Sequence, residues 1–370
     1  MRVAILHDYL NQFGGAERVL AALLEIFPEA DLYTLLYDEN KTLGLFKENI
    51  RRTSFLDYPW LRNRHRAFIP LMPLAARTMM IDNNYDLIIS SSAGYAKGFG
   101  HRHNDGYRPF HICYCHTPLR YAWEIDYLKN LPFAPWPLKE FVVRPIAKWL
   151  RDWDKESSKK VNVFVANSSY IAEKVKAYYG REAEVVYPPV NSEIFYPDST
   201  TEKKDYFLMV GRLLYYKGFD LGIKVFNTLK KNLKIVGLGP EISKLKKIAD
   251  PRYIEFIPFL KDEELRKSYS NAKALLFPQI EDFGLVAAEA QLCGLPVLAF
   301  NRGGVKEIVE GRKTGLLFEE QNEEAIVRAL EDFENLSFDR QYISRMAERF
   351  SKENFKTQIH AIIEKCGLKL

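Results

Sequence analysis

Short apolar runs alternate with amphipathic helical stretches along almost the whole chain, and this alternation constrains the fold most strongly. In the first half, apolar runs predict strands at residues 3–7, 31–36, 87–90, 110–114 and 163–166. A period of 3.6 residues predicts helices at 16–27, 144–158 and 170–179. Strands that alternate with helices in this way indicate βαβ units, and therefore a parallel, doubly wound sheet.

The alternation stops once, near the middle of the chain, and then restarts. Tyr187-Pro188-Pro189-Val190-Asn191 breaks the pattern, and a polar stretch at 197–205 follows it. Further strands are predicted at 206–210, 233–236, 253–256, 274–277, 297–299 and 315–318. We therefore predict an α/β protein with two Rossmann-like domains at 1–190 and 206–350, a linker at 191–205 and a terminal helical segment at 351–370.

Length and composition fit this prediction. The 370 residues are enough for two domains that each bury a core. The chain has no run of eighteen apolar residues, so no membrane span is expected, and the early charge in Met1-Arg2 argues against a signal peptide. The four cysteines form no disulfide pattern, which fits a reducing cytosol. Cys113 and Cys115 lack a second ligand pair for zinc, so we expect core cysteines and no metal.

The positive charge is concentrated in one segment. Residues 49–77 carry six arginines and one aspartate, which equals the whole net charge of +5. Phe55, Tyr58, Trp60 and Phe68 lie among these arginines. Such a basic–aromatic segment suits either an anionic membrane surface or an ordinary solvated face. No RNA- or DNA-binding motif accompanies it, so no nucleic-acid partner is expected.

The most specific motif lies at residues 277–290, where a strand end leads through a loop into a helix. Gly284 permits close approach of a ligand, and the amides of Gly284, Leu285 and Val286 open the helix and attract an anion. Glu289 follows Glu281 by eight residues, so we expect it about two turns further on a similar side. A phosphate flanked by hydroxyl groups, as in a nucleotide sugar, would match this pattern.

Two further loops follow predicted strands and lead into helices. Gly211 precedes Arg212, which can fork onto phosphate oxygens, and Lys217, which supplies a point charge. The paired cations suit a diphosphate. Gly14-Gly15 forms a second loop at a helix amino terminus, although a double glycine also suits any tight turn.

His116 is the remaining candidate. It lies where the predicted strand at 110–114 ends, and ligands of doubly wound folds bind outside the carboxyl ends of strands. The alternative is a histidine that is hydrogen-bonded inside the fold.

The pattern Glu281-x-Phe283-Gly284-x4-Glu289-Ala290 resembles the carboxyl-terminal signature of the retaining glycosyltransferases of family four, which have the GT-B fold. The resemblance implies two Rossmann-like domains facing across a cleft, with a last helix that crosses back to the first domain. It implies a nucleotide-sugar donor and metal-independent transfer with retention of configuration. The resemblance, together with the residues above, assigns catalytic roles to His116, Arg212, Lys217 and Glu281, and donor binding to Gly14, Gly15, Gly211, Arg212, Lys217, Gly237, Phe283, Gly284, Leu285, Val286 and Glu289.

A narrower resemblance concerns residues 115–123, where Cys-His-Thr-Pro is followed by Arg-Tyr-x-Trp. This run resembles bacterial mannosyltransferases that build O-antigen or related surface polysaccharides. It implies GDP-mannose as the donor and a lipid-linked saccharide as the acceptor. It also implies a cytoplasmic enzyme, with a peripheral position at the inner face of the membrane.

Three other functions are alternatives. A hydrolysing nucleotide-sugar epimerase of the same fold needs an acid–base pair of carboxylates that the sequence does not reveal. A non-catalytic sugar- or membrane-binding protein would not need both cations and both glutamates. A nicotinamide-dependent oxidoreductase needs a full glycine fingerprint, whereas Gly237-Leu238-Gly239-Pro240 lacks the third glycine and predicts a turn near a nucleotide base.

Asp152-Trp153-Asp154 falls within a predicted helix, so its carboxylates are expected at the surface. The oligomeric state stays open.

Overall fold

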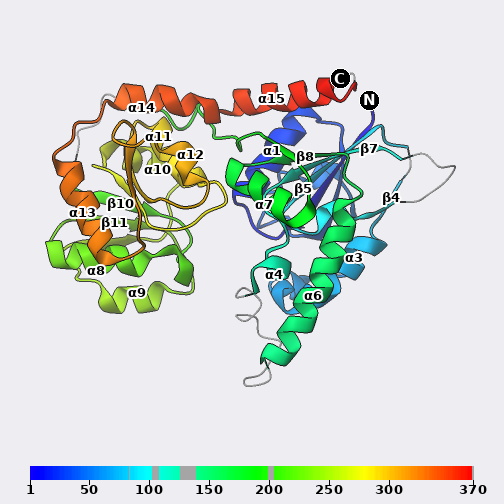
Figure 1. The fold of residues 1–370 in the computed structure, drawn as a ribbon, viewed down its shortest axis with the longest axis horizontal. Coiled ribbons are helices and arrows are strands. Elements are labelled where there is room, and N and C mark those ends of the chain that lie inside the picture. The colour runs from blue at the N-terminus through cyan, green and yellow to red at the C-terminus, as the bar shows by residue number, and fades with distance from the viewer. Residues whose placement is uncertain (83, 102–107, 126–138, 199–203, 369–370) are drawn as a thin grey trace. The chain divides into compact units, whose positions relative to one another are not determined.

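The chain folds into two compact units (Figure 1). Unit 1 comprises Met1–Tyr187 and Lys356–Leu370, and unit 2 comprises Pro188–Phe355. The structure is a computed structural model that describes all residues except 83, 102–107, 126–138, 199–203 and 369–370. In this division the predicted linker at 191–205 belongs to unit 2, and the last helix, α15 (Lys352–Lys365), is divided at Lys356.

Unit 1 is built on a parallel sheet. Among the described residues it has seven strands in the order β3-β2-β1-β5-β7-β8-β9. They are β1 (Val3–Leu10), β2 (Asp31–Tyr37), β3 (Ile50–Thr53), β5 (Leu87–Ser92), β7 (Phe110–Cys115), β8 (Val163–Ala166) and β9 (Ala183–Val185), and a separate pair is formed by β4 (Met80–Ile81) and β6 (Gly100–His101). The helices are α1 (Gly15–Ile26), η1 (Lys47–Asn49), α2 (Pro59–Arg62), η2 (His65–Leu71), α3 (Met72–Thr78), η3 (Ala96–Gly98), α4 (Arg120–Trp123), α6 (Lys139–Ser158) and α7 (Ser169–Tyr179).

Unit 2 has the same architecture with six parallel strands in its described part. Their order is β12-β11-β10-β13-β14-β15. The strands are β10 (Phe207–Val210), β11 (Leu233–Val236), β12 (Ile254–Ile257), β13 (Leu275–Phe277), β14 (Val297–Phe300) and β15 (Gly315–Phe318). The helices are η4 (Tyr215–Lys217), α8 (Phe219–Leu229), α9 (Ile242–Ile248), α10 (Asp262–Asn271), α11 (Leu285–Leu292), α12 (Val305–Ile308), α13 (Glu323–Glu334), α14 (Arg340–Ala347) and η5 (Glu348–Phe350). The prediction of two Rossmann-like sheets is confirmed.

The strand order explains where polar side chains gather. In each sheet the order reverses between two central neighbours, β1 and β5 in unit 1 and β10 and β13 in unit 2. Chains that leave these neighbours cross over to opposite faces of the sheet, so a crevice opens at their carboxyl ends.

The short edge strands were missed by the sequence interpretation. Strand β3 reads Ile50-Arg51-Arg52-Thr53, and both arginines are exposed. Strand β9 is only three residues long and half-buried. An edge strand faces solvent on one side, so its apolar signal is weaker than that of β5, which is buried at every residue.

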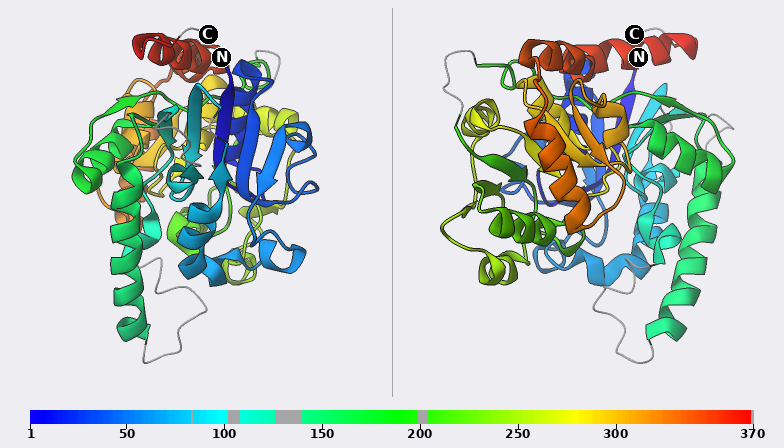
Figure 2. Two further views of the ribbon diagram at one scale, coloured as in Figure 1. Left: turned by 90° about the vertical axis from the view of Figure 1, so that its right-hand side faces the viewer. Right: turned by 60° about the vertical axis from the view of Figure 1, so that its left-hand side comes forward.

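Helices from distant parts of the chain share one apolar core in unit 1. Ile69 of η2 and Met72 and Ala76 of α3 are buried in the same cluster as Val143 and Leu150 of α6. In both views of Figure 2, α6 (green) and the α2–η2 segment (light blue) lie in the lower half of the picture, and α6 reaches further down. The basic–aromatic segment and α6 therefore share one part of unit 1.

A buried ion pair joins α6 to the loop after β5, and it overturns one prediction. Asp154 was expected at the surface, but its side chain has no exposed area and lies 2.6 Å from Nζ of Lys97, which is 1% exposed. Trp123 Nε1–H and the Tyr179 hydroxyl donate to the same carboxylate, at 2.8 and 2.7 Å. The helix pattern was read correctly, but the face of the helix that carries Asp154 packs against α4 and α7.

Removing this carboxylate should be costly. Replacing Asp154 by alanine would leave the Lys97 ammonium buried without its counter-charge, so we expect Asp154→Ala to lower the free energy of unfolding by about 3–5 kcal/mol. Thermal denaturation would measure the loss. The control is Asp152→Ala, which removes an exposed carboxylate two residues away and should change stability by less than about 0.5 kcal/mol. Equal melting temperatures for the two variants would contradict the assigned role of the pair.

Candidate functional site

The loops after β10 and β11 approach each other closely, next to the central crevice of unit 2. Gly211 and Gly237 both have a φ of +147°, which side-chain-bearing residues rarely adopt. A Cβ atom on Gly237 would lie 1.9 Å from the carbonyl oxygen of Gly211. Both glycines are thus required by the backbone itself. Gly237 is followed by exposed Leu238. Both residues belong to the turn that was predicted to lie near a nucleotide base.

Lys217 and Glu281 meet although 64 positions separate them. Lys217 ends η4 after β10, and Glu281 lies in the loop after β13, the neighbouring parallel strand. Nζ of Lys217 is 2.8 Å from Oε1 of Glu281, and the side chains are 13% and 26% exposed. The contact is an ion pair without good hydrogen-bond alignment, since Oε1 lacks a well-aligned donor. Arg212 lies in the same β10 loop and is exposed.

The amino terminus of α11 offers two amide donors beside this pair. Gly284 caps the helix with a φ of +111°, and its carbonyl accepts from the amides of Ala287 and Ala288. The amides of Leu285 and Val286 have no acceptor among the described residues. First-turn amides without a partner, together with the helix dipole, favour an anion.

The geometry corrects the expected relation between the two glutamates. Glu281 is not on the helix but in a bridge to Gly303, and α11 begins only at Leu285. The argument from two helical turns therefore fails, because the first four residues of the motif are loop. Glu289 is buried at 6% exposure, and its Oε2 accepts a hydrogen bond of 3.2 Å from the Tyr269 hydroxyl.

Phe283 is buried in the loop that carries Glu281. It is 4% exposed, and its ring packs edge-on against Phe350 at a centroid distance of 5.4 Å. Phe283 thus anchors the loop that carries Glu281.

In unit 1 the predicted glycine loop follows β1 at the central crevice. Gly14 is the cap of α1, and its amide donates to Oε2 of Glu17 at 2.8 Å. Gly15 is the first residue of that helix. Glu17 is 2% exposed, because its side chain folds back over the loop instead of reaching into solvent.

His116 lies directly after β7, as predicted, and is 9% exposed. Its Nε2 is 2.8 Å from Oγ of Ser91, and Nδ1 of His7 lies 3.0 Å from the same hydroxyl. Burial, with a smaller contribution from the neighbouring His7, lowers the pKa of His116 to about 3. The imidazole is therefore neutral near pH 7 and cannot supply a proton as an ordinary acid would.

Sequence reasoning missed several members of this crevice. Asp8 follows His7 on β1, and its carboxylate accepts hydrogen bonds from the amides of Ala93, Tyr95 and Ala96. These hydrogen bonds hold the loop after β5 in place. His7 and Ser91 are direct partners in the register of β1 and β5. One sequence signal could have identified these residues. His7-Asp8 and Ser90-Ser91-Ser92 are polar, and both follow apolar residues of strands.

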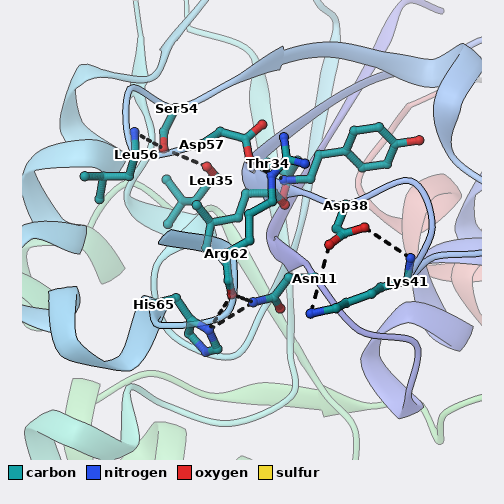
Figure 3. Close-up of polar contacts among 12 residues, drawn as sticks. Asn11, Thr34, Leu35, Asp38, Lys41, Ser54, Leu56, Asp57, Arg62 and His65 are labelled. Carbon is teal, nitrogen blue, oxygen red and sulfur yellow. Dashed lines mark hydrogen bonds and ion pairs between the residues drawn. The ribbon is translucent and has the colours of Figure 1, made fainter. Parts of the chain in front are cut away.

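The side chain of Asn11 hydrogen-bonds the basic–aromatic segment at the end of β1 (Figure 3). Nδ2 of Asn11 donates to the carbonyl of Arg62 at 2.7 Å and lies 2.9 Å from Nδ1 of His65. The Arg62 guanidinium is engaged by Asp57 at 2.8 Å and is only 24% exposed. Arg62 is thus a structural cation, whereas Arg64 and Arg66 are exposed.

The cysteines and carboxylates do not form a metal site in the part of the chain that the structure describes, where no group of three or more His, Cys, Asp or Glu residues is placed to hold an ion. Cys113 and Cys115 are buried on β7. Burial raises the pKa of Cys113 to about 12, so this thiol stays protonated. The expectation of core cysteines is confirmed.

Two family models match consecutive parts of the chain. "Glycosyltransferase Family 4" matches residues 13–194, and "Glycosyl transferases group 1" matches residues 190–356. The two matches leave only short stretches at the ends of the sequence.

Individual relatives match over shorter stretches. A segment of 135 residues is 42% identical to an uncharacterized glycosyltransferase of Haemophilus influenzae and covers 34% of this chain and 38% of that protein. A segment of 192 residues is 27% identical to the GDP-mannose-dependent alpha-(1-6)-phosphatidylinositol monomannoside mannosyltransferase of Mycobacterium tuberculosis and covers 44% and 50%. The chain thus matches at most half the length of these two relatives.

A solved structure extends the likeness to the whole fold. Anabaena Alr3699/HepE in complex with UDP has a TM-score of 0.69 at 18% identity, and the match covers 99% of this chain and all of that one. Together with the two parallel sheets, this likeness confirms the predicted GT-B fold class.

The buried His116 predicts a loss of stability in acid. Its pKa lies below the usual value of 6.5, so the unfolded chain binds the proton first and stability falls as the pH drops from about 6.5 toward 3. Between pH 7.5 and 5.5 we expect His116 to contribute a loss of roughly 1.4 kcal/mol, or roughly 3–5 °C in melting temperature. Melting curves of His116→Asn should lack this part of the loss, whereas the exposed His360→Asn should retain it. The same acid sensitivity in all three proteins would show that His116 is not neutral in the fold.

Proposed function

Because the chain belongs to the glycosyltransferase family that these two models describe, we propose that it transfers a hexose from a nucleotide sugar to a saccharide acceptor with retention of configuration. The observation that carries the proposal is the group of positive charges and amides at the crevice of unit 2. Arg212, Lys217 and the amides of Leu285 and Val286 follow neighbouring strands, and all of them favour an anion.

These groups suit the charge that develops during transfer. As the bond from the anomeric carbon to the diphosphate breaks, negative charge grows on the departing oxygens and positive charge grows on the sugar. Cations and helix amides that are already in place stabilise the departing diphosphate without reorganisation. We propose that this replaces a divalent metal ion, and that the acceptor attacks from the side of the departing phosphate.

The carboxylates complete the proposed donor site. Oε1 of Glu281 lies 2.8 Å from Nζ of Lys217, and its second oxygen can accept from hydroxyls of the transferred sugar. Glu289 is assigned to the ribose hydroxyls. This role requires it to exchange or share its contact with Tyr269.

Mannose, carried by GDP, is the proposed sugar. Support comes from the run at 115–123 and from the mycobacterial relative, whose name gives GDP-mannose as its donor. The structural neighbour was solved with UDP, so a comparison of GDP with UDP tests the nucleotide base.

We propose a lipid-linked acceptor that is presented at an anionic membrane surface. Trp60 is 61% exposed and Phe55 50%, and exposed arginines lie between them and α3. Helix α6 adds Phe141 at 80% exposure and Trp149 at 45%, in the same part of unit 1. No helix among the described residues has the length and apolar composition needed to cross a bilayer, so the proposed contact is peripheral.

A thermal-shift screen tests the donor. We expect GDP and GDP-mannose to raise the melting temperature, because a ligand at a hundred times its dissociation constant adds about 2.7 kcal/mol of stability. UDP, UDP-glucose and NAD are each tested separately at the same concentration for comparison. Stabilisation by UDP alone would overturn the choice of base and leave the glycosyltransferase proposal standing, whereas stabilisation by NAD alone would overturn both.

Turnover tests the two cations. Each of Arg212→Ala and Lys217→Ala should reduce kcat by about 30- to 1,000-fold, which corresponds to the loss of roughly 2–4 kcal/mol of transition-state stabilisation. Lys224→Ala removes an exposed cation on α8, paired with Glu323, and should leave the rate unchanged. Rates in excess EDTA and in Mg²⁺ should be equal. Wild-type rates in both folded cation variants would exclude these residues from the site.

Liposome co-sedimentation tests the membrane contact. A variant with Arg64, Arg66 and Arg77 changed to glutamine should bind vesicles containing phosphatidylserine less tightly, since each arginine near an anionic leaflet contributes about 1 kcal/mol. Changing the exposed Lys246, Lys247 and Arg312 of unit 2 removes the same charge elsewhere and should have little effect. Binding of the wild type should weaken with salt. If both triple variants bind as the wild type does, the segment is an ordinary solvated face.

A further inference from the structure

Four buried polar side chains form a continuous chain at the central crevice of unit 1. Oε1 of Glu17 lies 3.7 Å from Nε2 of His7, whose Nδ1 lies 3.0 Å from Oγ of Ser91. The same Oγ lies 2.8 Å from Nε2 of His116. Glu17, His7 and Ser91 are at most 2% exposed, and His116 is 9% exposed. The chain thus runs from α1 through β1 and β5 to the end of β7.

The carboxylate at one end gives the chain a direction. At 3.7 Å the Glu17 carboxylate is too far from Nε2 of His7 for a hydrogen bond, but its negative charge favours a proton on the ring nitrogen that faces it, which is Nε2. The Nδ1 of His7 then carries a lone pair and accepts from the Ser91 hydroxyl. The Ser91 oxygen, having donated its only hydrogen, accepts from Nε2–H of His116. Each step follows from the one before, because a neutral imidazole has one donor and one acceptor nitrogen.

We infer that Glu17, His7 and Ser91 are positioning residues that hold His116 as the Nε2–H tautomer, so that its Nδ1 presents a lone pair to a hydroxyl of the bound saccharide. No described residue hydrogen-bonds to this Nδ1. The tautomer follows from the chain alone, whereas the saccharide as its partner rests on the proposed function.

The surroundings keep His116 neutral, because burial and the neighbouring His7 lower its pKa. Asp8 is adjacent to His7, but its carboxylate is occupied by three backbone amides of the loop after β5. The ring of Tyr114 packs edge-on against His116 at 5.2 Å, and Cys115 precedes it on β7. Glu17 is the carboxylate that faces His7, and its other oxygen is held by the Gly14 amide.

Glu17→Gln is a substitution that reverses the chain without removing the helix cap. The glutamine carbonyl can still accept from the Gly14 amide, since Gln replaces Glu in a capping box. Its amide nitrogen then faces Nε2 of His7, and an amide nitrogen only donates. Nε2 of His7 must therefore accept, Nδ1–H donates to Ser91, and the Ser91 hydroxyl donates to Nε2 of His116. The proton of His116 moves to Nδ1.

The ¹⁵N chemical shifts of histidine ring nitrogens distinguish the two tautomers directly, without any bound substrate. In protein labelled with ¹⁵N-histidine, we expect His7 and His116 to be Nε2–H tautomers in the wild type and Nδ1–H tautomers in Glu17→Gln. In Ser91→Ala, where the chain is interrupted, a further Glu17→Gln change should leave His116 unaffected. An Nδ1–H His116 in the wild type, or one that does not respond to Glu17→Gln, would overturn the inference.

Turnover of GDP-mannose supplies the second measurement. Glu17→Gln and Ser91→Ala should each lower kcat by about tenfold or more, the value of one misdirected hydrogen bond. Ser90→Ala is the matched control, because Ser90 makes a 2.8 Å contact with His111 on the opposite face of the same strand. Equal losses in Ser90→Ala and Ser91→Ala would show that both serines only stabilise the sheet and would overturn the positioning role. If the wild type does not turn over GDP-mannose, the proposed donor fails, and the tautomer measurement still decides the inference.

Discussion

The reversal of strand order at the centre of each sheet is the constraint on which both candidate sites depend. Because all strands are parallel, their carboxyl ends lie along one edge, and the reversal leaves one gap in the row of crossing connections. In unit 2 the gap brings the β10 loop with Lys217 against the β13 loop with Glu281. In unit 1 it brings His7 opposite Ser91. The same reversal of strand order thus gathers different groups in the two units. In unit 2 it brings charged side chains together, and in unit 1 it brings hydrogen-bonding side chains together.

Two lysine–carboxylate pairs show how burial separates structural from functional charge. Lys97 and Asp154 are almost fully buried, and two further donors hold the carboxylate in place. Such a pair cannot exchange partners without a large desolvation cost. Lys217 and Glu281 are 13% and 26% exposed, and their contact lacks good hydrogen-bond alignment. A more polyvalent anion can therefore compete for Lys217, which suits the proposed role of Lys217 in binding a diphosphate.

The sequence predicted the repeating architecture well because parallel strands are buried on both faces and carry a continuous apolar signal. It failed at β3, where Arg51 and Arg52 lie at an exposed edge. The sequence correctly placed Lys217, Glu281 and His116 after the ends of strands, because the position of a strand end depends only on the local pattern. It could not predict that Asp154 is buried, because this depends on which helix packs against α6. The chain from Glu17 to His116 was missed for the same reason, as its members are joined only by the strand order.

If the basic–aromatic segment binds a membrane as proposed, the contact of Asn11 with Arg62 would affect the choice of acceptor. Asn11 immediately follows β1, so the backbone that carries Trp60 and Arg64 is tied to the end of a rigid strand by a bond of 2.7 Å. On the proposed membrane surface, this strand end would stand at a fixed height above the lipid headgroups. A saccharide could reach it only if the spacer between its lipid anchor and its terminal sugar matches that height. The attachment would then act as a ruler, selecting acceptors by the length of the chain already built as well as by the identity of the last sugar.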